Sequence, residues 1–177
     1  MKHFIYLTIA LFAAFSLASC NDDDTIDEAW KDANLKAYND TIKNAGYKDV
    51  RLTFHATDGT GPLGVYFKSL KEGTGTEHPL QTSKVKVLYY GYYYNGTVFD
   101  TGSSSNNIPV EFLTVATVRG FSYALQNMVV GDHWKICIPY YLGYGVSGNI
   151  DSYGNVLLKG YTTLFFDVEL VSITQYP

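Results

Sequence analysis

The chain has 177 residues, which is enough for one ordinary domain with an extension. Hydrophobic residues make up 46% and charged residues 17%, as in a folded globular protein. The formal net charge of -4 provides no basic patch, so nucleic acid is excluded as an expected partner. Sixteen Tyr and ten Phe against two Met favour a β-rich architecture packed with aromatic rings.

Residues 1–19 have the pattern of a signal peptide: a basic start, an apolar run and small residues before a cysteine. The run is too short for a comfortable membrane-spanning helix. The tetrapeptide Leu17-Ala18-Ser19-Cys20 resembles a bacterial lipobox. That resemblance implies a lipid on Cys20 that anchors the chain to the bacterial outer membrane, on its periplasmic or outer side. The alternative is an ordinary secretory signal that happens to end in cysteine. With Cys20 acylated, Cys137 is left alone and no disulfide framework is expected.

Residues 20–60 are predicted to form an acidic tether, a helix and a strand. The acidic run 21–24 is similar to a surface-display signal of some Gram-negative lineages, or is simply a solvated tether. A helix is expected over 26–45, capped by Thr25 or Asp27. Its apolar face comprises Trp30, Ala33, Ala37, Tyr38, Thr41, Ile42 and Ala45. Such a helix either docks on its own domain, the commoner outcome, or pairs with a second copy, so a monomer or weak dimer is expected.

Residues 61–177 are predicted to form the main domain. Period-two alternation predicts strands over 64–71, 85–90, 110–113, 134–138 and 163–173. Another strand is expected around Val50, Leu52 and Phe54, before a turn over 58–62. Asn95-Gly96 predicts a type I′ turn, in which both residues have φ > 0, and so a hairpin ending at Asp100. Apolar residues at helical spacing predict a helix over 119–128. Residues 146–156 are expected to form a polar loop, and the motifs for a phosphate loop or a calcium loop are incomplete, so no metal or cofactor is expected.

Six blocks follow one another in the second half of the chain. They are Val87-Leu88-Tyr89-Tyr90-Gly91, Asn95-Gly96-Thr97-Val98-Phe99-Asp100, Arg119-Gly120-Phe121, Met128 with Gly131, Leu142-Gly143-Tyr144-Gly145 and Leu164-Phe165-Phe166-Asp167-Val168-Glu169-Leu170. In this order and spacing, residues 61–174 resemble an FKBP-type peptidyl-prolyl isomerase. The resemblance implies an α+β fold, in which a twisted antiparallel sheet of about five strands wraps around one short helix. The helix over 26–45 is an extension of that fold.

The resemblance also implies the site, position by position. It implies catalytic roles for Asp100, Tyr144, Phe166 and Tyr89, and substrate contacts for Phe99, Val110, Val118, Phe121, Leu157 and Leu158. Val110 stands where the family has a large aromatic residue, and Phe121 where most members have Trp. Lys159-Gly160 replaces a usual pair of prolines. Each ring also has a purely structural interpretation, as sheet core or as the buried anchor of a helix.

The implied function is isomerisation of X–Pro bonds in proline-containing polypeptides that are being exported. That reaction needs no nucleophile, because no covalent bond to the protein forms. A second hypothesis is an FKBP-like module that binds polypeptides without turning them over, since fold does not entail function. A third is a display role for the loops 101–107 and 146–156, as in an adhesin.

Overall fold

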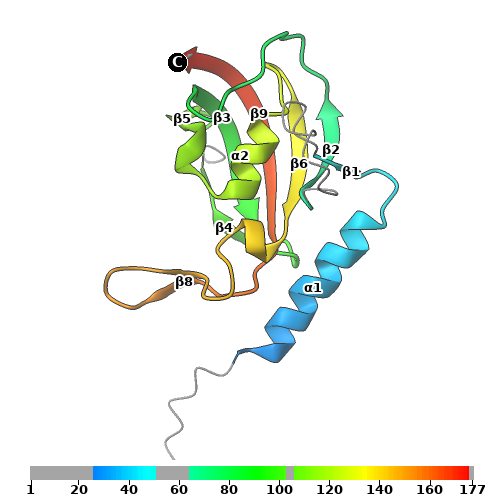
Figure 1. Cartoon of the computed structure of the whole chain (residues 1–177), viewed down its shortest axis with the longest axis vertical. Helices are drawn as coiled ribbons and strands as arrows, with labels where there is room; N and C mark the ends of the chain where they lie inside the picture. Colours follow the sequence, from blue (N-terminus) through cyan, green and yellow to red (C-terminus); the bar gives the residue numbers. More distant parts are fainter. Residues whose placement is uncertain (1–25, 51–63, 103–105, 176–177) are drawn as a thin grey trace, which may run out of the picture.

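The computed structural model describes residues 26–50, 64–102 and 106–175. A strongly curved antiparallel sheet wraps around the short helix α2, while helix α1 lies below the sheet (Figure 1). The helices are α1 (Glu28–Ile42) and α2 (Arg119–Leu125), with single 3₁₀ turns η2 (Thr114–Ala116) and η3 (Tyr140–Leu142). The strands are β1 (Lys48–Asp49), β2 (Tyr66–Lys71), β3 (Lys84–Tyr92), β4 (Val98–Asp100), β5 (Val110–Leu113), β6 (His133–Ile138), β7 (Asn149–Ile150), β8 (Val156–Leu158) and β9 (Leu164–Gln175).

The main sheet has seven strands in the order β1-β2-β6-β9-β3-β4, with β5 also paired to β3. The α+β class is therefore confirmed, and the very short β1 and β4 account for the strands beyond the expected five. The alternation on β3 and β9 directs apolar side chains inward: Val85, Val87, Leu164, Val168 and Leu170 are all fully buried. They pack against the apolar face of α2, which buries Phe121, Ala124 and Leu125.

The turn between β3 and β4 differs from the expected type I′ geometry. Gly96 has a φ of +84°, but Asn95 is not among the residues with positive φ. The Gly96 N–H donates to the Tyr93 carbonyl at 2.9 Å, and the Thr97 N–H donates to the Asn95 side-chain oxygen at 3.0 Å. The backbone of Asn95 does not have a positive φ, and its side chain supplies a hydrogen bond within the turn. One left-handed residue, Gly96, is therefore enough to reverse the chain.

The predicted loop over 146–156 contains a second hairpin, in which β7 pairs with β8. It projects from the body of the domain to the lower left in Figure 1. Its turn is closed by Asp151, whose carboxylate accepts the N–H groups of Tyr153 and Asn155 at 2.8 and 2.9 Å. Ile150 and Val156 are exposed and Leu158 is buried, and strands this short show no repeating apolar period from which a strand could be predicted.

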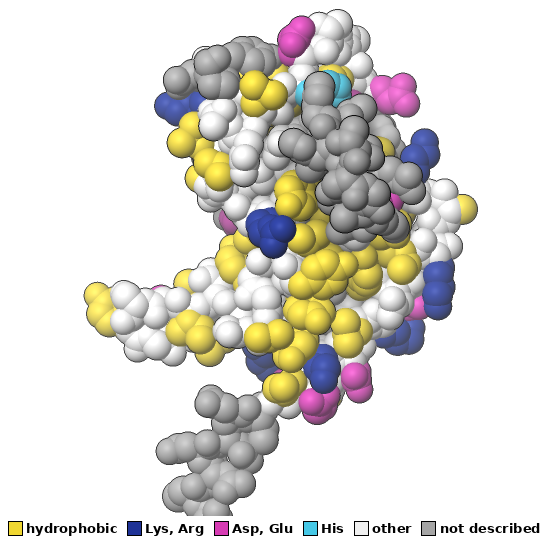
Figure 2. Space-filling view, in the orientation of Figure 1, with side chains coloured by type: hydrophobic (Ala, Val, Ile, Leu, Met, Phe, Trp, Pro, Cys, Tyr) yellow, Lys and Arg dark blue, Asp and Glu magenta, His cyan; other side chains and the backbone are white. Residues whose placement is uncertain are grey.

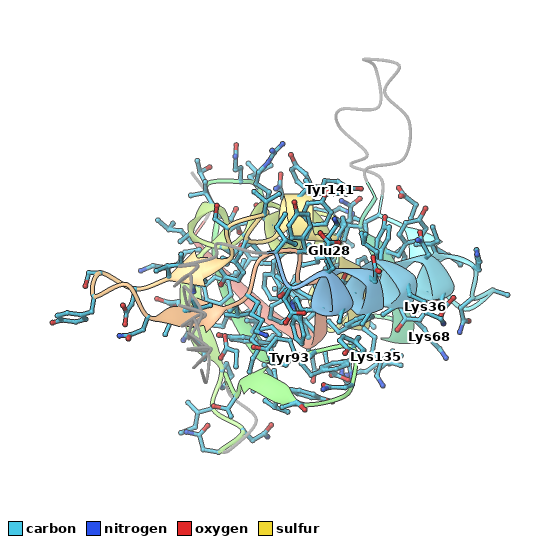
Figure 3. All side chains as sticks on the ribbon, turned by 90° about the horizontal axis from the view of Figure 1, so that it is seen from below. Glu28, Lys36, Lys68, Tyr93, Lys135 and Tyr141 are labelled. Atoms are coloured by element: carbon cyan, nitrogen blue, oxygen red, sulfur yellow. The ribbon has the colours of Figure 1, made fainter. Side chains whose placement is uncertain are left out.

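Helix α1 docks on its own domain, as the commoner alternative predicted. Asp27 caps it by accepting the Trp30 N–H at 2.9 Å, and the helix ends at Ile42, three residues before the expected end at Ala45. On β9, the strand alternation points Phe165 to the face of the sheet opposite α2. This side chain is nevertheless only 8% exposed, and its ring stacks on that of Tyr92. In the view from below, α1 crosses the domain between Tyr141 on one side and Tyr93 and Lys135 on the other (Figure 3).

Several predictions concern residues that the structure does not describe: the signal peptide, Cys20, the helix cap at Thr25, the strand at Leu52 and Phe54, and the turn over 58–62. In the part of the chain that is described, neither helix is long and apolar enough to cross a bilayer.

Candidate active site

Aromatic rings from several elements meet on the concave side of the sheet. The Phe121 ring on α2 lies 4.9 Å from that of Phe166 on β9 and 5.9 Å from that of Tyr89 on β3, measured between centroids. The Phe99 ring on β4 meets that of Phe166 edge to face at 5.6 Å and 84°. Edge-to-face pairs of this kind are favourable beyond the area they bury. The fold therefore brings together four of the rings that the sequence predicted for the site.

Gly91 permits this meeting of rings. A Cβ atom at this position would lie 2.7 Å from the Phe166 ring and 2.7 Å from the Phe99 ring. Gly91 pairs with both Asp100 on β4 and Phe166 on β9, so it sits where the two strands flank β3. Absence of a side chain here allows the rings of the neighbouring strands to close over the backbone of β3.

A carboxylate and two phenols stand beside the rings. The Tyr89 hydroxyl donates to Asp100 Oδ2 at 3.1 Å, and the Gly102 N–H donates to Asp100 Oδ1 at 2.9 Å. Burial, with the charge of Asp100 second, raises the pKa of Tyr89 to about 12. Burial and the same carboxylate also raise the pKa of Tyr144. Both phenols are therefore protonated donors at neutral pH, and Asp100 is held by donors on both of its oxygens.

The remaining predicted residues are spread around this group. Val110 begins β5 opposite Val87 and is half-buried, and Val118 precedes the first residue of α2, packed against the core. On β8 the two leucines separate: Leu158 is 8% exposed and joins the core, whereas Leu157 is 56% exposed. Successive side chains of a strand point to opposite faces, so only Leu158 contacts the core that holds the rings.

Two further rings were not predicted for the site. Phe112 on β5 lies 6.2 Å from both Tyr89 and Phe121, and Tyr93 packs on Phe99 at 5.0 Å. The period of two from Val110 to Phe112 is the signal that identifies the first. Tyr93 lies just beyond β3, where the alternation ends, and nothing in the pattern around it marks its contact.

The arrangement suits binding of an apolar group rather than covalent chemistry. Cys137, the free thiol of the described chain, is fully buried on β6, and burial raises its pKa to about 12. It is therefore not a nucleophile at neutral pH. Among the described residues, no group of three His, Cys, Asp or Glu side chains is placed to hold a metal ion.

The fold and the ring cluster together define a class: a small α+β domain in which aromatic rings meet beside a fixed carboxylate. A family model described as FKBP-type peptidyl-prolyl cis-trans isomerase matches residues 75–171, more than half of the chain. The chain therefore belongs to the FKBP-type peptidyl-prolyl cis-trans isomerase family.

Relatives and solved structures agree with this assignment. The chain is 39% identical over 112 residues to the macrophage infectivity potentiator of Trypanosoma cruzi, covering 63% of this chain and 54% of that protein. It is 32% identical over 114 residues to the outer membrane protein MIP of Legionella longbeachae, covering 64% and 46%. The chain thus spans about half the length of the curated relatives it matches. The crystal structure of a peptidyl-prolyl cis-trans isomerase from Pseudomonas syringae superposes with a TM-score of 0.67 at 28% identity, covering 86% of this chain and 99% of that one.

Proposed function

We propose that this protein is a peptidyl-prolyl cis-trans isomerase that acts on exported polypeptides. The observation that carries the proposal is the meeting of the Tyr89, Phe99, Phe121 and Phe166 rings beside Asp100. A proline ring is apolar and rigid, and it packs on aromatic faces at little cost in conformational entropy. In this proposal the substrate prolyl ring packs over Phe121, and the amide to be rotated faces Asp100.

The chemistry requires differential binding and no covalent step. Rotating an X–Pro amide breaks C–N conjugation against a barrier of about 18–20 kcal/mol. The twisted amide is less polar than the planar one, so a site that excludes water disfavours the ground state more than the transition state. A millionfold acceleration corresponds to about 8 kcal/mol of such differential binding.

The chain's polar groups orient the substrate in this scheme. The Tyr144 hydroxyl, at the edge of the site, donates to a substrate carbonyl, as does the backbone N–H of Val118. Asp100 acts electrostatically, held in place by Tyr89 and the Gly102 N–H. Val110 and Leu157 with Leu158 border the bound segment. Because neither phenol needs to ionise, the rate is expected to be flat across neutral pH.

We further propose a division of the chain and a location. Residues 1–19 are a lipoprotein signal peptide, 20–60 a tether with the helical extension, and 61–177 the FKBP-like domain. The lipid on Cys20 anchors the protein to the bacterial outer membrane, and its partners are proline-containing polypeptides. The Legionella relative named as an outer membrane protein supports a location in the envelope. Palmitate labelling that survives in Cys20→Ala would refute the anchor.

The test of catalysis is a protease-coupled assay on a short X–Pro peptide. The wild-type chain is expected to accelerate the slow phase, and Asp100→Ala and Tyr144→Phe are each expected to lower kcat/KM at least tenfold. Tyr153→Phe is the matched control, because Tyr153 is 89% exposed at the tip of the β7–β8 hairpin. A wild-type rate equal to the uncatalysed one would refute the proposal.

A second candidate function is an FKBP-like module that binds unfolded chains without isomerising them. Two observations favour it: Val110 on β5 is smaller than the aromatic residue that the family resemblance implies at this position, and exposed hydrophobic side chains lie on the projecting hairpin (Figure 2). Protection of an aggregating protein that persists in Asp100→Ala would support this candidate over catalysis.

A further inference from the structure

Trp30, on α1 and outside the matched family region, contacts two segments of the domain at once. Its indole Nε1–H donates to Thr162 Oγ1 at 3.2 Å. The edge of its ring meets that of Tyr93 at 5.4 Å and 79°. Thr162 lies just before β9, and Tyr93 just after β3, so one side chain of the extension joins two chain reversals of the domain.

One contact leads to the wall of the site. The Tyr93 ring packs on Phe99 at 5.0 Å, and Phe99 in turn meets Phe166 edge to face. The Tyr93 N–H also donates to the Thr97 carbonyl at 2.9 Å, which closes the β3–β4 hairpin. Trp30 therefore supports, through Tyr93, the pair of rings Phe99 and Phe166 that forms one side of the site.

The other contact leads to Tyr144. Thr162 Oγ1 donates to the Lys159 carbonyl at 2.6 Å, which folds the segment between them into a tight turn. Within that turn Tyr161 has a φ of +59°, a conformation that costs a non-glycine residue about 1 kcal/mol or more and persists only when its surroundings impose it. The Tyr161 N–H donates to the Gly145 carbonyl at 3.0 Å, and Gly145 follows Tyr144 directly.

The position of Trp30 is itself determined by a buried amide one turn along α1. Asn34 is fully buried, and its side chain accepts the Thr163 N–H at 2.9 Å and donates to the Trp30 carbonyl at 2.8 Å. The Thr163 hydroxyl donates to the Asn34 carbonyl at 3.0 Å. A buried amide without these hydrogen-bond partners would lower the stability of the fold, so this end of α1 has one favoured position on the domain.

We propose that Trp30 is a positioning residue for the isomerase site. Through Tyr93 it fixes the position of Phe99. Through Thr162 it fixes the position of the turn 159–162, which is hydrogen-bonded to Gly145 beside Tyr144. This role rests on the proposed function. Catalysis is sensitive to small displacements, and about 1 Å of misplacement can cost about a hundredfold in rate. The extension thereby acts on the reaction without touching the substrate.

The experiment compares three variants of the full chain. Trp30→Ala removes both contacts, whereas Trp30→Phe keeps an aromatic ring beside Tyr93 but loses the N–H and part of the indole area. Lys36→Ala is the matched control on the same helix, because Lys36 is exposed and forms an ion pair with the exposed Asp40, at 2.6 Å. Each variant is assayed for kcat and KM well below its unfolding temperature, and hydrogen exchange of the Tyr161 N–H is measured in parallel.

Trp30→Ala is expected to lower kcat/KM about tenfold and to speed exchange at Tyr161, with Trp30→Phe between it and the wild type and Lys36→Ala unchanged. An active wild type with kcat, KM and Tyr161 exchange equal in Trp30→Ala and Lys36→Ala would overturn the inference alone, and the same equality in Trp30→Phe would overturn its Thr162 branch. A loss of activity in Trp30→Ala that merely tracks its unfolded fraction would overturn it as well. An inactive wild type would overturn the proposed function, and this role for Trp30 with it.

Discussion

Replacing Tyr89 with Phe isolates the hydrogen bond at the centre of the site. The change keeps the ring, which contacts Phe121 and Phe166, and removes only the hydroxyl that donates to Asp100 at 3.1 Å. Among the described residues, Asp100 then keeps one donor, the Gly102 N–H at 2.9 Å. The carboxylate is expected to rotate about its remaining hydrogen bond, away from the position that faces the substrate amide.

The magnitude follows from the kind of bond and its surroundings. A hydrogen bond to a charged group contributes about 1.5–3 kcal/mol when buried. Tyr89 and Asp100 are half-buried, so solvent screening reduces the expected effect to about 1–2 kcal/mol. If that energy is expressed in the transition state, kcat/KM falls about fivefold to thirtyfold.

The assay is a double-mutant cycle on kcat/KM with Tyr89→Phe, Asp100→Asn and the pair. We expect coupling: after Asp100→Asn, removing the Tyr89 hydroxyl should lower kcat/KM much less than it does in the wild type. Unfolding temperatures of all four proteins establish that each is folded under assay conditions. Additive losses, or an unchanged rate in Tyr89→Phe, would refute the reasoning that the phenol acts through the carboxylate.

Three further outcomes follow from the structure. Gly91→Ala places a methyl group 2.7 Å from two rings and is expected to lower the free energy of unfolding by about 1–3 kcal/mol in urea titrations. An unfolding free energy equal to that of the wild type would contradict this expectation. Cys137 is expected to react with a thiol reagent at pH 8 only upon unfolding, because burial raises its pKa to about 12; rapid labelling of the native protein would contradict this. The folded-state pKa of Tyr89, about 12, lies above the unfolded value of about 10, so stability is retained below pH 10 and declines from there to about pH 12. Tyr89→Phe should therefore show a shallower alkaline decline in unfolding free energy, and equal slopes would disprove the link.

Much of the fold could be predicted because its strands have one buried face. Val85 and Val87 repeat with a period of two, and both point into the core, as does the helical face from Phe121 to Leu125. Asp27 caps α1 as its residue type and position suggest. Local chemistry and burial agree in these elements, so the pattern of the sequence is enough to predict them.

The remaining features depend on contacts that sequence patterns do not carry. The strands of the β7–β8 hairpin are too short to show a repeating buried side: Leu158 joins the core, whereas Ile150 and Val156 are exposed. In the β3–β4 turn the Asn95 side chain caps the backbone, so the turn lacks the pair of left-handed residues that a type I′ turn requires. Asn34 is polar at a position that α1 buries, because Thr163 supplies its hydrogen-bond partner from far along the chain. The predicted rings of the site do meet. The packing of Tyr93 on Phe99, by contrast, could be identified only from the three-dimensional structure.

The most direct measurement of the central claim is two-dimensional NMR exchange on a short Ala–Pro peptide with a small fraction of the protein added. Uncatalysed interconversion takes about 10–100 s, too slow for exchange peaks at sub-second mixing times. The account predicts cross-peaks between the cis and trans proline signals with the wild-type chain, and strong weakening of these peaks with Asp100→Ala at equal concentration. Cross-peaks absent with a folded wild-type chain, or equally strong with Asp100→Ala, would contradict the claim that the rings around this carboxylate catalyse the rotation.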